Sequence, residues 1–215
     1  MRSDLAVLFD LDSTLVDSKL AVRTSWLQLA DEAGFDPRAM RGMHGVPAEG
    51  CLRLLLPDAD EATIQHWTQR IEDIEVAMVD GVVPIDGALE LLATLDSNQV
   101  PWTVVTSCTA PLAAVRLRAA GITHHPTTVT FSDVSQGKPH PEPFLLGAKR
   151  LGIAPELCWV VEDAHSGTTA GRAAGCTVAG VLTTSTREQL PNAHHYLEHL
   201  LDLLPLLGIN QSTRQ

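Results

Sequence analysis

The segment LAVLFDLDSTLVDS, residues 5–18, decides how the rest of the chain is interpreted. Its first five residues form a short, continuous apolar run, which is typical of a fully buried strand in a parallel sheet. Asp10 and Asp12 follow this run, and the hydroxyl of Thr14 comes two residues later. Open parallel sheets bind ligands beyond the carboxyl ends of their strands, so both carboxylates are predicted at a ligand site. Asp, Ser and Thr are also ordinary turn residues, so a solvated turn is the alternative until other residues support a ligand site.

The composition limits the classes of protein to consider. The chain has 215 residues, 45% of them hydrophobic, enough for a core domain with a smaller companion. The net charge is −11 and there is no basic run, so nucleic acid is not an expected partner. No apolar segment approaches the roughly 20 residues that span a bilayer, and no signal-peptide pattern is present. Four widely spaced cysteines without a CxxC motif favour reduced, buried thiols in the cytoplasm over disulfides or metal ligation.

Apolar, β-branched runs recur along the chain and predict strands. These runs are residues 5–11, 102–106, 127–131, 157–162 and 176–182. Helical patterns lie between the later runs, and each ends next to a glycine, which is a common helix stop. The helical patterns cover residues 110–120, 142–151 and 166–174. This alternation predicts a Rossmann-like, doubly wound parallel α/β sheet.

Residues 19–83 interrupt the alternation, because they contain no convincing strand. Helical patterns there cover residues 21–33, 48–56 and 61–79. We therefore expect a small α-helical cap domain, residues 18–81, inserted into an α/β core domain, residues 1–17 and 82–215. Extra core helices are the simpler interpretation. Insertion at the carboxyl end of a strand favours a lid over the ligand site.

Three further sets of polar residues follow predicted strands or occupy a rigid turn. Thr106 and Ser107 could cap the next helix or donate hydrogen bonds to an anion. Lys138, flanked by glycine and proline, is either a surface charge or a fixed cation for a phosphate or carboxylate. Glu162 and Asp163 are adjacent carboxylates, which resist burial unless a cation lies between them. Ligand sets made of oxygen alone favour Mg²⁺ over zinc. Chance agreement of all these sets with the Asp10 segment is negligible.

Together these residues resemble the haloacid dehalogenase superfamily, over essentially the whole chain. The matching segments are DLDST at 10–14, Thr106, GKP at 137–139 and EDAHSG at 162–167. The helical insertion is similar to that family's α-helical cap. The resemblance is closest to the sugar phosphatases and glycerol-phosphate phosphatases, through residues 43–45, 101–107 and 145–148. Ser13 departs from the family pattern, which has glycine there, so we expect a slightly altered turn with activity retained.

The resemblance implies a Mg²⁺-dependent phosphatase that works through an aspartyl-phosphate. Asp10 would attack phosphorus, while Asp12 would protonate the leaving oxygen and then activate water. The implied catalytic residues are Asp10, Asp12, Thr106 and Lys138, the last two holding the phosphoryl oxygens. The implied Mg²⁺ ligands are Asp10, the main-chain carbonyl of Asp12, Glu162 and Asp163.

The substrate class is less defined than the reaction. His44, Gly45 and Ser107 are the candidate substrate-binding residues, although His44 is as well explained as an ordinary histidine. A small cap favours a small hexose, deoxyhexose, pentose or polyol phosphate. Asp12 argues for phosphoryl chemistry over dehalogenation, because a halide leaves without a proton. Two alternatives remain open, a phosphomutase of the β-phosphoglucomutase type and a non-catalytic phosphometabolite-binding module. We expect a cytoplasmic monomer or weak homo-oligomer that binds a small phosphorylated metabolite, with no nucleic acid or membrane partner.

Overall fold

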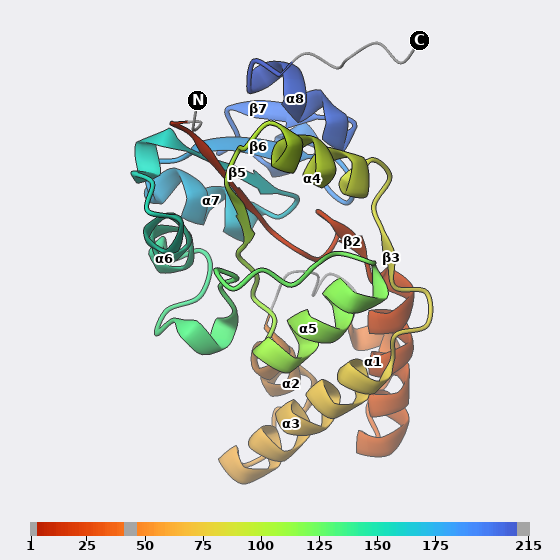
Figure 1. Ribbon diagram of the computed structural model, residues 1–215. Coiled ribbons are helices and arrows are strands. Elements are labelled where there is room, and N and C mark those ends of the chain that lie inside the picture. The colour runs from red at the N-terminus through yellow and green to blue at the C-terminus, as the bar shows by residue number, and fades with distance from the viewer. Residues whose placement is uncertain (1–3, 41–46, 210–215) are drawn as a thin grey trace. The chain divides into compact units, whose positions relative to one another are not determined.

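The computed structural model of the chain describes residues 4–40 and 47–209 (Figure 1). The chain forms two compact units. The core unit comprises residues 1–17 and 83–215, and the helical unit comprises residues 18–82.

A parallel five-stranded sheet is the centre of the core unit within the described residues, in the order β4–β1–β5–β6–β7. The strands are β1 (Ala6–Phe9), β4 (Trp102–Val104), β5 (Cys158–Glu162), β6 (Thr177–Val181) and β7 (His195–Leu197). Strand β1 lies inside the sheet, where Phe9 is paired with Val104 on one side and Val161 on the other. Every residue of β1 is fully buried, as its continuous apolar run predicts.

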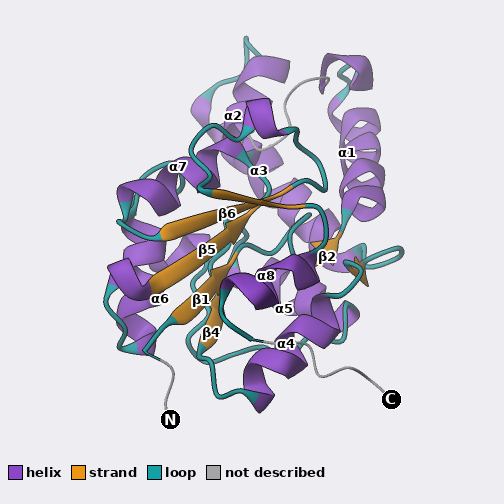
Figure 2. Cartoon of the chain, turned by 90° about the horizontal axis from the view of Figure 1, so that it is seen from above, coloured by secondary structure: helices purple, strands orange, loops and turns teal. Residues whose placement is uncertain are grey.

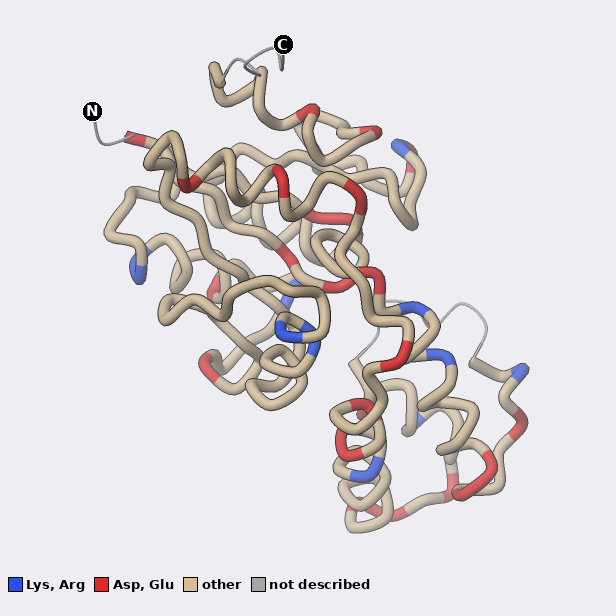
Figure 3. Tube along the Cα trace, turned by 45° about the vertical axis from the view of Figure 1, so that its right-hand side comes forward, with Lys and Arg blue, Asp and Glu red and all other residues tan. Residues whose placement is uncertain are grey.

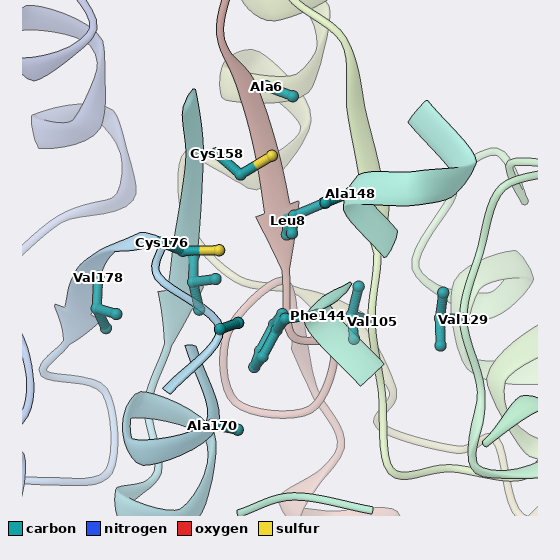
Figure 4. Close-up of a cluster of buried hydrophobic side chains, with 12 residues drawn as sticks. Ala6, Leu8, Val105, Val129, Phe144, Ala148, Cys158, Ala170, Cys176 and Val178 are labelled. Atoms are coloured by element: carbon teal, nitrogen blue, oxygen red, sulfur yellow. The ribbon is translucent and has the colours of Figure 1, made fainter. Parts of the chain in front are cut away.

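Helices cover both faces of this sheet, as Figure 2 shows. On one side lie α6 (Glu142–Leu151) and α7 (His165–Ala173), and on the other α4 (Ala88–Ser97), α5 (Ala110–Ala119) and α8 (Leu203–Leu206). The main apolar cluster fills the space between the sheet and α6 and α7, with Leu8 and Phe144 completely buried in it (Figure 4). Both Cys158 and Cys176 contribute to this cluster, and none of the four cysteines forms a disulfide. The predicted Rossmann-like parallel α/β fold is confirmed.

The predicted strand over residues 127–131 is wrong. Only Val129 pairs with the sheet, through a single parallel bridge to Val105. The chain reaches this bridge from a turn, closed where the N–H of Thr128 donates to a carbonyl three residues earlier, at 3.0 Å. A short 3-10 helix, Phe131–Asp133, follows directly. Conversely, β7 and α4 lie outside the predicted elements, and β7 is an edge strand of three residues without a continuous apolar run.

The helical unit contains α1 (Lys19–Ala33), α2 (Ala48–Leu55) and α3 (Glu61–Ala77), close to the predicted helical patterns. Its own apolar core consists of Leu29, Leu52, Ile64, Ile71 and Ile74. Asp60 caps α3 by accepting a hydrogen bond from the N–H of Thr63 at 2.8 Å. Arg70 of α3 donates two hydrogen bonds of 2.7 Å to Glu32 of α1, which holds these two helices side by side.

The chain leaves and re-enters the core unit through two adjacent short strands. These are β2 (Val16–Asp17) and β3 (Val83–Pro84), paired antiparallel in a separate two-stranded sheet. Among the described residues, no helix combines the length and the apolar character that crossing a membrane requires.

Candidate active site

The carboxyl end of the parallel sheet brings together polar and charged side chains from three neighbouring strands and one loop. Asp10 follows β1, Thr106 follows β4, and Glu162 ends β5 with Asp163 directly after it. Lys138 comes from the loop before α6 and reaches into this group. The parallel topology explains the arrangement, because the ends of β4, β1 and β5 are neighbours at one edge of the sheet.

Lys138 is the centre of the group rather than a solvated surface charge. Its side chain is only 4% exposed. Its ammonium donates to Asp10 Oδ1 at 2.6 Å, to Glu162 Oε1 at 2.7 Å and to the carbonyl of Val105 at 2.8 Å. The ring of Phe144 lies beside it, 5.0 Å from Nζ to the ring centroid. These contacts give the ammonium a defined position in the site.

Asp10, Glu162 and Asp163 form a compact cluster of buried carboxylates. One oxygen of each lies within 4.8 Å of the others. Burial raises the pKa of Asp10 to about 7, and the charge of Glu162 adds to this effect. Burial also raises the pKa of Asp163 to about 6 and raises that of Glu162. Burial by itself would lower the pKa of Lys138, but the charges of Asp10 and Glu162 beside it raise this pKa overall. Three carboxylates share one lysine, so the cluster carries excess negative charge whenever all three are ionised.

A divalent cation suits this cluster. The donor atoms are carboxylate oxygens, which are the ligands that Mg²⁺ prefers. Both oxygens of Glu162 already accept hydrogen bonds, one from Lys138 and the other from the N–H of Ala164 at 3.0 Å. A Cβ on Gly167 would lie 1.7 Å from Glu162 Oε1, so only glycine leaves room for this carboxylate under the first turn of α7. The residues present thus fit a Mg²⁺ site with a rigidly oriented acidic group.

Asp12 lies at the same edge of the sheet, but it has different partners. Arg116 Nη1 of α5 donates to Asp12 Oδ2 at 2.5 Å, and Cys108 Sγ donates to the same oxygen at 2.9 Å. Sequence reasoning missed both residues, because neither ends a strand. The sequence did contain a signal for Arg116. It lies three and four residues after the apolar Ala113 and Leu112, so helical spacing places this charged residue on the buried face of α5.

The turn directly after Asp12 adopts the backbone conformation that glycine prefers. Ser13 has a φ of 65°, in the left-handed region, although it is not a glycine. The N–H of Ser13 donates to the carbonyl of Val16 at 2.7 Å, and the carbonyl of Ser13 accepts from Thr183 Oγ1 at 2.5 Å. Thr184 donates to Asp163 from the same loop after β6. This loop carries site contacts that the sequence motifs did not indicate.

The remaining predicted site residues are placed unequally. Thr106 is buried, and its hydroxyl oxygen accepts the N–H of Cys108 at 3.1 Å, so its proton is available to another acceptor. Ser107 is exposed beside it. His44 and Gly45 lie outside the described residues.

Positive charge is scarce elsewhere in the described chain. Lys and Arg lie in short separate stretches, mixed with Asp and Glu (Figure 3). With a net charge of −11, any attraction for an anionic ligand has to come from local groups such as Lys138.

Comparison with known proteins identifies the family. The sequence model of the haloacid dehalogenase-like hydrolases matches residues 7–181. Hexitol phosphatase A of Escherichia coli is 42% identical over 175 residues, 81% of each chain. Glycerol-1-phosphate phosphohydrolase 2 of Saccharomyces cerevisiae is 33% identical over 83% of this chain and 75% of its own length.

A solved structure agrees with these relatives. The crystal structure of a hydrolase from Pseudomonas syringae superposes with a TM-score of 0.82 at 27% identity, covering 95% of this chain and 98% of that one. The expected resemblance to sugar and glycerol-phosphate phosphatases is confirmed. The chain belongs to the haloacid dehalogenase-like hydrolase family.

Proposed function

We propose that this protein is a Mg²⁺-dependent phosphatase, a phosphoric monoester hydrolase that cleaves small sugar or polyol phosphates through an aspartyl-phosphate. The observation that carries the proposal is the buried carboxylate cluster with Lys138 bonded to Asp10 and Glu162. The activities named for the hexitol-phosphate and glycerol-phosphate relatives support the same substrate class.

Asp10 is the nucleophile in this proposal. Its Oδ1 is held by Lys138 at 2.6 Å, which orients the carboxylate and offsets part of its charge as a phosphate dianion approaches. A carboxylate can form a covalent phosphoryl intermediate and so divide one difficult displacement into two steps. Bound between Asp10, the carbonyl of Asp12, Glu162 and Asp163, Mg²⁺ would neutralise charge on the substrate oxygens. Thr106 and Lys138 are proposed to hold the phosphoryl oxygens.

Asp12 is the proton carrier. It protonates the departing sugar oxygen in the first step and, as a carboxylate, takes a proton from the attacking water in the second. Its side chain is 28% exposed, against 12% for Asp10, which suits a group that exchanges protons with a leaving group and water. The pair therefore divides into a buried nucleophile and a more accessible acid–base group.

The inserted helices are proposed as the cap domain that selects the substrate. They follow the nucleophile in the chain, between Asp17 and Val83, at the carboxyl end of β1. His44, Gly45 and Ser107 remain the candidate substrate-binding residues. We propose a cytoplasmic location, which the four cysteines without a disulfide support.

Phosphate release from sugar and polyol phosphates with Mg²⁺ tests the proposal. Asp10→Asn is expected to abolish release, whereas Asp31→Asn, at an exposed carboxylate of α1, is the matched control and is expected to retain it. A chelator is expected to stop the wild type, and added Mg²⁺ to restore it. Full activity in Asp10→Asn or with chelator contradicts the proposal. Isomerised sugar phosphate without phosphate release would identify a mutase, and tight binding without turnover a binding module.

A further inference from the structure

We infer that Arg116 is a positioning residue for Asp12, and that it fixes the carboxylate from which the proton reaches the leaving oxygen. The inference deepens the proposed phosphatase function and rests on it. Nothing in the sequence motifs assigns a role to Arg116, which lies on α5 and ends no strand.

The first support is the geometry around a single oxygen. Asp12 Oδ2 accepts from Arg116 Nη1 at 2.5 Å and from Cys108 Sγ at 2.9 Å. Arg116 Nη1 also lies 3.2 Å from Cys108 Sγ, so the three groups form a closed triangle. Two donors on one oxygen restrict rotation of the carboxylate about its bond to Cβ.

The second support is that the charged side chain of Arg116 is buried. Its side chain is only 7% exposed, and it shares its face of α5 with the buried residues Leu112, Ala113 and Leu117. A buried guanidinium is costly unless it has a charged partner. For stability alone, a leucine at this position would be as good or better. Arg118, two residues later on the same helix, is exposed. The contrast indicates that the chain retains a buried cation for Asp12.

The third support is that the segment leading into α5 connects Asp12 to Thr106, which is proposed to hold the phosphoryl oxygens. Cys108 donates its N–H to Thr106 Oγ1 at 3.1 Å and its thiol to Asp12 Oδ2. One continuous segment therefore carries Thr106, Cys108 and Arg116. It contacts the phosphoryl group through Thr106 and orients Asp12, the acid for the leaving oxygen, through the other two.

The reaction steps define what loss of Arg116 should change. In the first step an Asp10 oxygen bonds to phosphorus, the P–O bond to the leaving group breaks, and the leaving oxygen takes the proton of Asp12. In the second step water bonds to phosphorus, Asp12 takes its proton, and the bond to Asp10 breaks. A leaving group that is a weak base needs no proton in the first step, but the second step is common to all substrates.

Two substrates that differ in leaving group separate this role from a structural one. With glycerol phosphate, Arg116→Met is expected to lower kcat/KM by about 10- to 100-fold, within the range of general acid catalysis. With 4-nitrophenyl phosphate, kcat/KM is expected to change less than about 3-fold, because nitrophenolate leaves unprotonated. In rapid mixing, the variant is expected to release a burst of nitrophenolate as water attack becomes slow. Arg118→Met is the matched control and is expected to behave as the wild type.

Several outcomes overturn the inference. Equal losses of kcat/KM on both substrates indicate a structural role for Arg116. The double variant gives a second criterion. If Arg116 acts through Asp12, adding Arg116→Met to Asp12→Asn should lower kcat/KM little further. A full additional loss in the double variant would indicate a structural role for Arg116. If Arg116→Met does not fold, Arg116→Lys and Cys108→Ala should each shift the substrate ratio in the same direction by a smaller factor. An unchanged ratio in both refutes the role. A wild type that is inactive on every phosphate overturns both the proposed function and this inference. If the wild type is active, an unchanged substrate ratio in the variants overturns only the inference.

Discussion

Replacing Lys138 with methionine should destabilise the metal-free protein through charge rather than through packing. Methionine keeps most of the apolar stem, but it removes the ammonium from Asp10 at 2.6 Å and from Glu162 at 2.7 Å. Both carboxylates are buried, as is Asp163 beside them. Breaking a buried ion pair by deleting one partner costs about 3–5 kcal/mol, because the remaining charge is left without compensation. We expect a loss of that size in the free energy of unfolding at about pH 8.

The loss should shrink in acid, which distinguishes charge from packing. Without Lys138, the pKa values of Asp10 and Glu162 should rise further, because their cationic partner is gone. At about pH 5 the folded variant can bind protons at these carboxylates and remove the uncompensated charge. Lost packing, by contrast, costs the same at both pH values. We therefore expect clearly less destabilisation at about pH 5 than at about pH 8.

Urea unfolding with a chelator, followed by tryptophan fluorescence, measures both quantities. Lys149→Met is the matched control, since Lys149 is exposed on α6, and a surface substitution should change stability by no more than about 0.5 kcal/mol. A loss below about 1 kcal/mol for Lys138→Met, or an equal loss at the two pH values, would refute the electrostatic reasoning.

Three further predictions concern the turn, the glycine beneath the acidic cluster and pH. Ser13→Gly should raise the free energy of unfolding by up to about 1 kcal/mol and retain activity, because Ser13 occupies a left-handed φ of 65°. Gln99→Gly, at φ 57° outside the active site, should give a similar gain, and a loss of stability in both would contradict the strain argument. Gly167→Ala should lower both stability and activity, because the added Cβ would lie 1.7 Å from Glu162 Oε1; near-wild-type unfolding and kcat would show that the carboxylate moves freely. The metal-free protein should become less stable from about pH 4 to about pH 7, since the folded pKa of Asp10 is about 7 against an ordinary 3.8 and the folded state therefore binds its proton more tightly. Denaturation at a series of pH values checks this slope, and stability that rises over the same interval would contradict it.

Local patterns in the sequence were sufficient for the architecture and for the residues at strand ends. The buried run of β1 and the alternation of strands and helices could be predicted, because burial on both faces requires continuous apolar residues. Asp10 and Glu162 could then be placed together, since parallel strands end at one edge of the sheet. The predicted strand over residues 127–131 failed because β propensity shows that a segment can pair but does not provide a partner along its length.

Only the tertiary structure decided which side chains form hydrogen bonds and ion pairs with the strand-end carboxylates and the turn beside them. Lys138 could be a surface charge or a fixed cation until its three short hydrogen bonds were seen. Arg116 and Asp12 are 104 positions apart in the chain, and their contact depends on how α5 packs on the sheet. The same holds for Thr183 and Ser13, separated by 170 positions. The sequence by itself determined the fold and the strand-end carboxylates, because hydrophobic periodicity is local. The partners that orient those carboxylates are set by packing between distant segments, which no local pattern encodes.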